Sequence, residues 1–206
     1  MTAVQSKSRG RKRQIIDAAL RCFSEHGVSA TTIDMIREAS ATSVGSLYHH
    51  FGNKEAIAAA VFIEGMRDFA LQVATRLDSA NGAEEGIKAL VAANVEWISA
   101  NPDWARFCFH HRAQVRHEDA TERLRGDQQL FQERLRDWFA PYRGALRDLP
   151  IEVFAALVVG PTHDYARHWL AGRITTPLLE QLDTFAEAAW RSVRTEAESS
   201  SPVLMG

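Results

Sequence analysis

The sequence is poor in cysteine: Cys22 and Cys108 lie far apart, each inside an apolar stretch of helical spacing. A disulfide framework is therefore not expected, and both thiols are predicted to be buried in a protein of a reducing compartment. Long apolar runs are also missing. None approaches the roughly 20 residues that span a membrane, and no apolar region follows the basic N-terminus. We expect a cytoplasmic protein without a membrane partner.

Motifs of metal and catalytic sites are absent as well. The chain has no H-E-x-x-H, no cysteine pair, no G-x-S-x-G and no phosphate-binding glycine loop. No stretch alternates apolar and polar residues as a strand does, whereas helical spacing recurs along the chain. These absences predict an all-α fold without a cofactor, a metal ion or a catalytic residue.

Charge is distributed unevenly. The chain has 24 Lys and Arg residues against 26 Asp and Glu, a formal net charge of −2, but residues 1–54 hold eight basic residues and only four acidic ones. A basic segment attached to an acidic body is typical of a protein that contacts a polyanion at one end. From composition alone, ordinary surface charge without a function is the alternative.

The basic segment ends in residues 31–54, which are predicted to fold as two short helices. A threonine caps the first helix, in which Ile33 and Ile36 share one side. Residues 40–42 continue a helix poorly and form a turn, after which Ser43 caps the second helix. Two short helices joined by a tight turn have the outline of a helix-turn-helix.

The second of these helices has suitable side chains for entering a DNA groove. Its outward positions are small, hydroxyl-bearing or aromatic, whereas Leu47 and Phe51 are expected to point inward. Small residues let a helix approach closely, and hydroxyl, phenol and imidazole groups reach phosphates or base edges.

The residues SVGSLYHHFGNKEAI, with their Leu-Tyr-His-His-Phe core and Asn-Lys-Glu helix opening, resemble the signature of the TetR family of transcriptional regulators. The resemblance implies an N-terminal three-helix helix-turn-helix domain with a basic arm, residues 1–53. It also implies a C-terminal helical domain for effector binding and dimerisation, residues 54–206. Two turn positions differ, because Ala41 stands where glycine is usual and Thr42 where an apolar residue is usual. Alanine is strained there if its backbone is left-handed.

The resemblance also implies which residues contact DNA. Expected to meet the major groove and its flanking phosphates are Thr31, Thr32, Val44, Gly45, Ser46, Tyr48, His49 and Lys54. Val44 is apolar and makes no bidentate hydrogen bond to a base, so operator specificity is expected to depend on Arg37, Tyr48 or the N-terminal arm.

The N-terminal arm is predicted from residues 1–10, which are polar and unpatterned. A basic cluster follows, made of Arg9, Arg11, Lys12 and Arg13. It either contacts phosphates or serves as a solubilising tail, and the sequence leaves both interpretations open. A supporting helix over residues 13–26 is predicted to stop at Gly27.

Helical spacing predicts the body. The expected helices cover residues 54–77, 83–100, 103–112, 120–142, 151–171 and 177–195. The last two form an antiparallel hairpin, and the resemblance implies that hairpins from two copies bury each other as a homodimer interface. The alternative is that both helices belong to ordinary intrachain core.

Aromatic and polar residues of the body form a candidate effector site, because aromatic walls with a few polar groups are typical of small-molecule sites in helical bundles. Gly160-Pro161 is expected to kink a helix in this region. Simple core packing is the alternative for each aromatic residue. Asp164 and His168 share a helix face and are interpreted as a structural or ligand-orienting pair. The candidate effector-binding residues are Trp97, Trp104, Phe107, His110, His111, Trp138, His163 and Asp164.

Together these patterns predict a homodimeric DNA-binding regulator, a repressor that a small-molecule effector releases from a palindromic operator on double-stranded DNA. A helical metal sensor or enzyme using the histidine-rich body is the alternative. An architectural or partner-binding protein without an effector is a third hypothesis, and activation in place of repression stays open.

Overall fold

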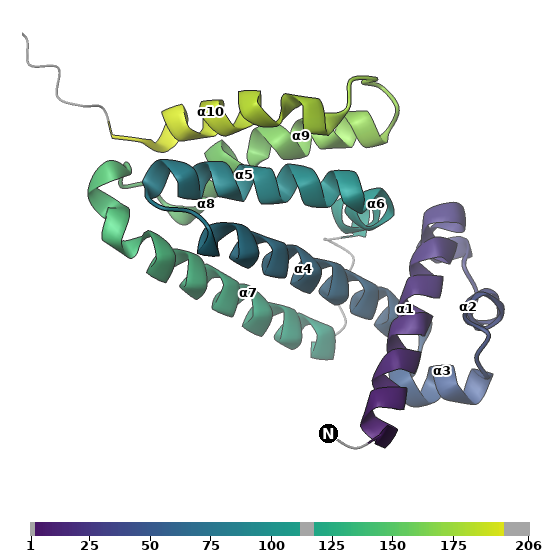
Figure 1. Ribbon diagram of the computed structural model, residues 1–206. Coiled ribbons are helices and arrows are strands. Elements are labelled where there is room, and N and C mark those ends of the chain that lie inside the picture. Colours follow the sequence, from purple (N-terminus) through teal and green to yellow (C-terminus); the bar gives the residue numbers. More distant parts are fainter. Residues whose placement is uncertain (1–2, 112–117, 196–206) are drawn as a thin grey trace, which may run out of the picture.

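The computed structural model describes residues 3–111 and 118–195, and the regular elements in that part of the chain are helices (Figure 1). The prediction of an all-α fold is confirmed. The closest approach to sheet structure there is a single antiparallel bridge between Leu146 and Arg194. No helix in the described residues combines the length and the apolar content needed to cross a membrane.

Three helices form the N-terminal part: α1 (Ala3–Ala30), α2 (Ile33–Ser40) and α3 (Val44–Phe51). The predicted arm is wrong for residues 3–10, because α1 already begins at Ala3. A single Gly10 disfavours a helix by only about 1 kcal/mol, which the long helix tolerates. Gly27 adopts φ 76 and interrupts α1 where the stop was predicted, after which a last turn reaches Ala30.

The long helix α4 (Lys54–Asp78) connects this N-terminal part to the body. Asn53 caps it, since the Asn53 Oδ1 atom accepts a hydrogen bond of 2.7 Å from the Ala56 amide. Figure 1 shows α4 running from the vicinity of α1 and α3 to the far end of the body. It packs against α5 (Ala83–Ala100) and α7 (Glu118–Phe139), and α6 (Pro102–His111) turns back toward α1.

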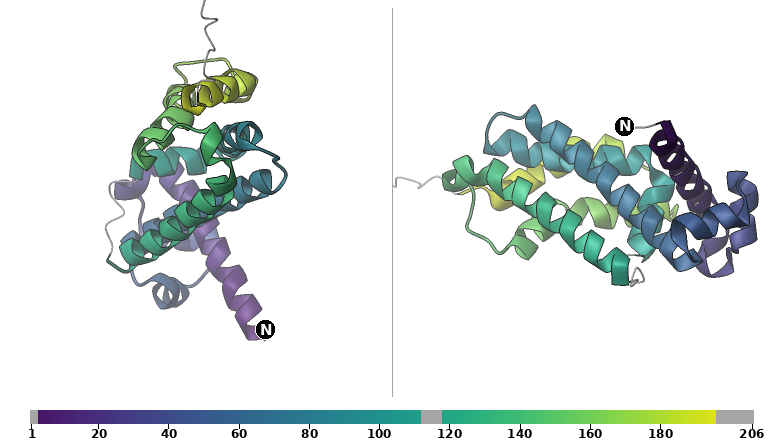
Figure 2. Two further views of the ribbon diagram at one scale, coloured as in Figure 1. Left: turned by 90° about the vertical axis from the view of Figure 1, so that its left-hand side faces the viewer. Right: turned by 90° about the horizontal axis from the view of Figure 1, so that it is seen from below.

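The C-terminal helices cover α5 on the side opposite to α4 and α7, as Figure 1 and the left view of Figure 2 show. The helix predicted over 151–171 is in fact two: α8 (Ile151–Val158) and α9 (Gly160–Leu170). The helix breaks at Val159 because Pro161 has no N–H to donate to the Leu157 carbonyl.

Short 3-10 segments replace two predicted helix ends. The segment η1 (Ala140–Ala145), which contains Pro141, follows α7, so this helix ends before the predicted residue 142. The segment η2 (Leu178–Gln181) precedes α10 (Leu182–Val193), so the final helix is shorter than the predicted 177–195. The core is continuous from the N-terminal part into the body; fully buried members are Ile15, Ile36, Leu47, Ile57, Val61, Leu77, Ile87, Val91, Ile98 and Leu178.

Candidate DNA-binding surface

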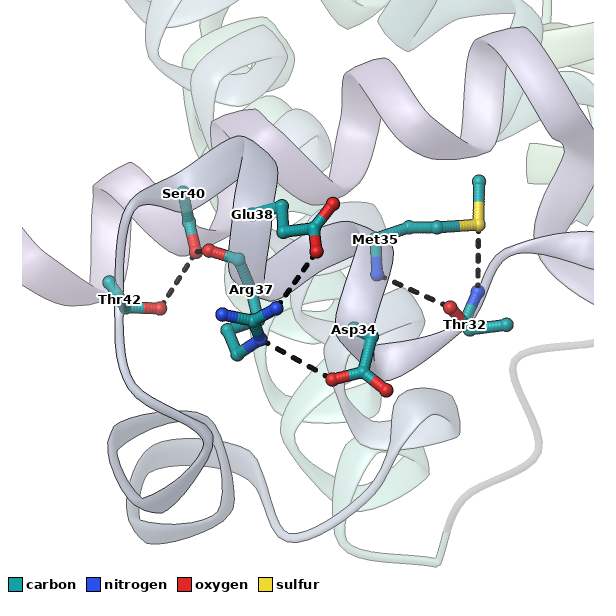
Figure 3. A network of polar contacts seen from close by, with 7 residues as sticks. All are labelled: Thr32, Asp34, Met35, Arg37, Glu38, Ser40 and Thr42. Carbon is teal, nitrogen blue, oxygen red and sulfur yellow. Dashed lines mark hydrogen bonds and ion pairs between the residues drawn. The ribbon is translucent and has the colours of Figure 1, made fainter.

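The helix α2 begins at a reciprocal cap, which Figure 3 shows. The Thr32 hydroxyl accepts a hydrogen bond of 3.2 Å from the Met35 amide, and the Met35 sulfur accepts one of 3.4 Å from the Thr32 amide. This arrangement satisfies two amides that a helix start would otherwise leave without partners. The capping threonine is therefore Thr32, which is also exposed, as a DNA-contacting residue must be.

Arg37 belongs to an ion-pair network on α2 (Figure 3). Its Nε atom lies 3.3 Å from the Asp34 carboxylate and an Nη atom lies 2.8 Å from the Glu38 carboxylate. The two acids neutralise the guanidinium on its own helix surface. Arg37 was expected to contribute to operator specificity, and in this structure its charge is balanced by two acids of its own helix.

The turn between α2 and α3 is left-handed at Ala41, with φ 48 and ψ 39. The Ala41 amide donates to the Arg37 and Glu38 carbonyls, and the Ser40 and Thr42 hydroxyls lie 2.7 Å apart (Figure 3). Gln14 of α1 donates a hydrogen bond of 2.9 Å to the Ser40 carbonyl. These contacts hold the turn in a conformation that alanine alone disfavours.

The helix α3 presents one face outward. Ser43 caps it, since the Ser43 hydroxyl accepts a hydrogen bond of 3.2 Å from the Ser46 amide. Leu47 is 1% exposed and packs into the core, whereas Tyr48 is 54% exposed. The predicted contact residues Val44, Gly45 and His49 are exposed too, and Ser46 is half-buried. Side chains of this kind on an exposed helix suit groove and phosphate contacts.

Two of the predicted DNA contacts, Thr31 and Lys54, have hydrogen-bond partners within the protein. Thr31 is 1% exposed, and its hydroxyl lies 2.8 Å from the Gly27 carbonyl and 3.1 Å from the Cys22 carbonyl. A side chain buried in this way does not reach DNA, so the prediction that the Thr31 side chain contacts DNA is wrong. Lys54 is half-buried, and its Nζ atom donates to the Ser29 and Thr31 carbonyls at 3.1 and 2.9 Å. Lys54 thus joins the start of α4 to the end of α1.

Basic residues of α1 lie beside the end of α3. The Lys12 ammonium is 5.8 Å from the centre of the Phe51 ring. Burial lowers the pKa of His50, and the neighbouring His49, Lys12 and Arg11 lower it further. This end of the surface therefore favours anions such as the phosphates of DNA.

Arg13 does not belong to this basic surface. Its guanidinium pairs with Glu64 of α4 at 2.9 Å and lies 5.0 Å from the centre of the Trp104 ring. The Trp104 indole donates a hydrogen bond of 3.0 Å to the Val61 carbonyl and packs on Gly65. Sequence reasoning missed this junction of α1, α4 and α6, because no local signal pairs Trp104 with Gly65.

The predicted effector residues do not gather around one cavity. Trp104 and Phe107 face α4 and α1, and Phe107 stacks on Phe23 with ring centres 5.6 Å apart. Trp97 is buried and donates a hydrogen bond of 2.9 Å to Asp68. These three aromatic residues are therefore core residues, the alternative that the sequence left open.

The remaining predicted effector residues are also dispersed. Trp138 donates to the Leu77 carbonyl, His110 contacts the Arg106 carbonyl, and His111 packs against the Phe107 ring. His163 shares a hydrogen bond of 2.9 Å with the buried Asn94. Asp164 is exposed and pairs with Arg167 at 2.9 Å, which lowers the pKa of its carboxyl. The hydrogen-bonding partner of Asp164 is thus Arg167, while His168, its predicted partner, also lowers the pKa of this carboxyl through its charge.

Comparison with known proteins supports the assignment made from α2 and α3. Residues 15–61 match the family model described as "Bacterial regulatory proteins, tetR family". The chain is 27% identical over 176 residues to the HTH-type transcriptional repressor AcnR of Corynebacterium efficiens, covering 84% of this chain and 88% of that protein. It is 30% identical over 144 residues to the HTH-type transcriptional repressor KstR2 of Rhodococcus jostii, covering 68% and 67%.

The fold is shared with solved structures. A TetR family transcription regulator from Marinobacter aquaeolei superposes with a TM-score of 0.76 at 16% identity, covering 95% of this chain and 100% of that one. At this low identity the structural similarity shows only that the fold is shared. The family is shown by the sequence matches. The protein belongs to the TetR family of transcriptional regulators, which bind DNA and are not enzymes.

Proposed function

We propose that the protein is a homodimeric repressor that occupies a palindromic operator and leaves it when a small-molecule effector binds the body. The observation that supports this most strongly is the arrangement of α3, in which Leu47 is buried and Tyr48 is 54% exposed. A helix anchored on one side and exposed on the other is available to the major groove.

The partner copy would cover the outer face of the C-terminal helices. On α8 the apolar residues Ile151 and Val153 are 52% and 44% exposed, and Leu179 of η2 is 51% exposed. Exposed apolar side chains such as Ile151 and Val153 of α8 are typical of an interaction surface. This supports the dimer interface that the family resemblance implies, and it sets the separation of the two α3 helices.

The coupling between effector and DNA would run through α4 and α6. Helix α4 begins at Lys54, next to the α1–α2 connection, and α6 contacts α1 through the Phe107–Phe23 stack. An effector that moves α4 would change the spacing of the two α3 helices away from the roughly 34–36 Å between successive major grooves. It shifts the equilibrium only by its differential affinity for the two states.

Selection of bound DNA from a random pool tests this function. We expect enrichment of one sequence with two inverted half-sites whose centres lie about one helical turn, or a multiple of it, apart. Enrichment of a single unrepeated half-site, or of no sequence at all, would contradict the operator proposal. The metal-sensor alternative has no observation in its favour, because the described residues hold no group of three His, Cys, Asp or Glu that suits a metal.

A further inference from the structure

A groove of about 810 Å³ lies between α4, α5 and α10, and none of the predicted effector residues lines it, although Trp97 donates a hydrogen bond to its lining residue Asp68. Its volume is within the range of roughly 300–1,000 Å³ that small-molecule sites occupy. Apolar atoms line it through Leu71 on α4, Ala89 and Ala92 on α5, and Leu182 and Ala186 on α10. Small alanine side chains on α5 and α10 leave room between the three helices.

The two basic residues of the groove are already neutralised. Arg76 donates hydrogen bonds from two guanidinium nitrogens to Glu96, one of them 3.0 Å long. The Lys88 ammonium lies 2.5 Å from Glu84 and 3.1 Å from Glu187, and these two hydrogen bonds raise the pKa of Lys88. These two residues therefore add little net positive charge that could attract an anionic ligand.

Three carboxylates of the groove have no cationic partner among the described residues. Asp68 accepts a hydrogen bond of 2.9 Å from the Trp97 indole, and Glu85 accepts one of 2.7 Å from the Asn81 amide. Both donors are uncharged. Asp183 lies in the first turn of α10 on the opposite wall and has no ion pair there. The groove therefore combines apolar walls with uncompensated negative charge.

We propose that this groove binds an organic cation with an apolar body, with Asp68 and Asp183 facing its charge from opposite walls and the leucine and alanine side chains contacting its body. Because α4 supplies one wall, a bound cation would bias the position of the helix that leads to the DNA-binding surface. Only this regulatory consequence rests on the proposed function; the binding site itself does not.

A pair of ions with the same shape and opposite charge tests the site. Tetraphenylphosphonium is the cationic probe and tetraphenylborate the anionic one, and binding of each to the full chain without DNA is measured by isothermal titration calorimetry. We expect the cation to bind and the anion to bind at least tenfold more weakly, since the carboxylates repel it. Equal affinities, or no binding of the cation, would overturn the proposal.

Charge-removing variants locate the site. Asp68→Asn keeps an oxygen acceptor for the Trp97 indole, and Asp183 is exposed, so neither Asp68→Asn nor Asp183→Asn disturbs a buried contact. Each is expected to weaken the cation about threefold to tenfold. The control is Asp137→Asn on the exposed side of α7, outside the groove, which should leave the affinity unchanged. Equal effects of all three variants would place the cation elsewhere and overturn the proposal.

Operator release is measured separately, by fluorescence anisotropy of labelled DNA during titration with tetraphenylphosphonium. The regulatory role is supported if the cation releases the operator and if Asp68→Asn raises the concentration of tetraphenylphosphonium needed for release. If the cation binds the groove but leaves DNA affinity unchanged, the result supports the binding site and contradicts its regulatory role. If the protein binds no DNA, the proposed function is contradicted. The calorimetric measurement still tests whether the cation binds in the groove.

Discussion

At the scale of single residues, Ala41 stores strain in the helix-turn-helix. It is the one non-glycine residue with positive φ in the part of the chain that the structure describes. A left-handed backbone disfavours alanine by roughly 1–2 kcal/mol, and hydrogen bonds of the Ala41 amide and of Gln14 to Ser40 hold the turn against it.

Replacing this residue relieves the strain. Ala41→Gly is expected to raise the free energy of unfolding by roughly 0.5–1 kcal/mol, because the relief exceeds the added entropy of the unfolded chain. Ala39→Gly is the matched control, since Ala39 is exposed in the helical part of α2. Glycine disfavours a helix, so this variant should lower the free energy of unfolding by about 1 kcal/mol. Urea denaturation measures both. Destabilisation by Ala41→Gly would show that the turn is not strained.

We expect His50 to make DNA affinity depend on pH. Its pKa in the free protein is below the ordinary 6.5, through burial and the nearby His49, Lys12 and Arg11. Phosphates of bound DNA favour the protonated form, so the pKa rises on binding and a proton is taken up. Affinity should therefore increase as pH falls from about 8 to about 6.

The variant His50→Gln should flatten this pH dependence, because the titrating group is gone. The control is His110→Gln on α6, where the exposed imidazole lies in the body. Operator affinity at several pH values by fluorescence anisotropy distinguishes them. An unchanged slope in His50→Gln would show that another group takes up the proton.

At the scale of helices, the junction of α1, α4 and α6 depends on the lack of a side chain at Gly65. A Cβ atom there would lie 2.8 Å from the Trp104 ring. The indole fixes its position by donating to the Val61 carbonyl, and the Arg13 guanidinium covers its other side. Displacing Trp104 would therefore disturb the contact between the body and the DNA-binding helices.

Gly65→Ala is expected to lower the free energy of unfolding by about 1–3 kcal/mol, because the added methyl group overpacks the junction. Gly126→Ala is the control, since nothing lies within 4 Å of a Cβ atom at that position on α7 and alanine favours the helix. Thermal or urea unfolding measures both variants. If Gly65→Ala is as stable as the parent, the junction is looser than its contacts indicate.

Helix positions could be predicted where local signals are strong. Asn53 begins α4, and Asn81-Gly82 separates α4 from α5, as expected from capping and turn preferences. The break between α8 and α9 could not be predicted with certainty, because an internal proline kinks one helix or separates two. At this break Thr162 is buried, and its hydroxyl lies 2.7 Å from the Val159 carbonyl and 2.9 Å from Asn94, a residue distant in sequence.

The exposed face of α3 was predictable because neighbouring positions of a helix point in different directions. Burying the apolar Leu47 therefore leaves Tyr48 outside. The burial of Thr31 was not predictable, because Thr31 and Thr32 have identical side chains and the carbonyls that Thr31 contacts, those of Cys22 and Gly27, become its neighbours only in the folded chain. The aromatic residues of the body were predictable as buried or half-buried, but their partners lie far away in sequence. Trp104, for example, packs on Gly65 and Trp138 packs on Gly86, and neither glycine is close to its tryptophan in sequence.

At the scale of the whole molecule, the DNA-binding surface and the proposed dimer surface lie on different parts of the chain, so they can be disrupted independently. Val153→Glu is expected to dissociate the dimer, because a charge would have to be buried without a partner in the apolar interface. The control is Leu130→Glu, the same kind of change at a 66% exposed position on α7. Sedimentation analysis measures the mass of each. A dimeric Val153→Glu variant would place the interface elsewhere.

The central claim is that the exposed face of α3 binds DNA. Its most direct test is the affinity of Tyr48→Ala for the selected operator, measured by fluorescence anisotropy beside Leu130→Ala, which also truncates an exposed side chain. Two copies of Tyr48 act in a dimer, and each hydrogen bond is worth about 1 kcal/mol, so we predict an affinity loss of about tenfold to a hundredfold with the dimer intact. Equal operator affinities of Tyr48→Ala and Leu130→Ala would contradict the account.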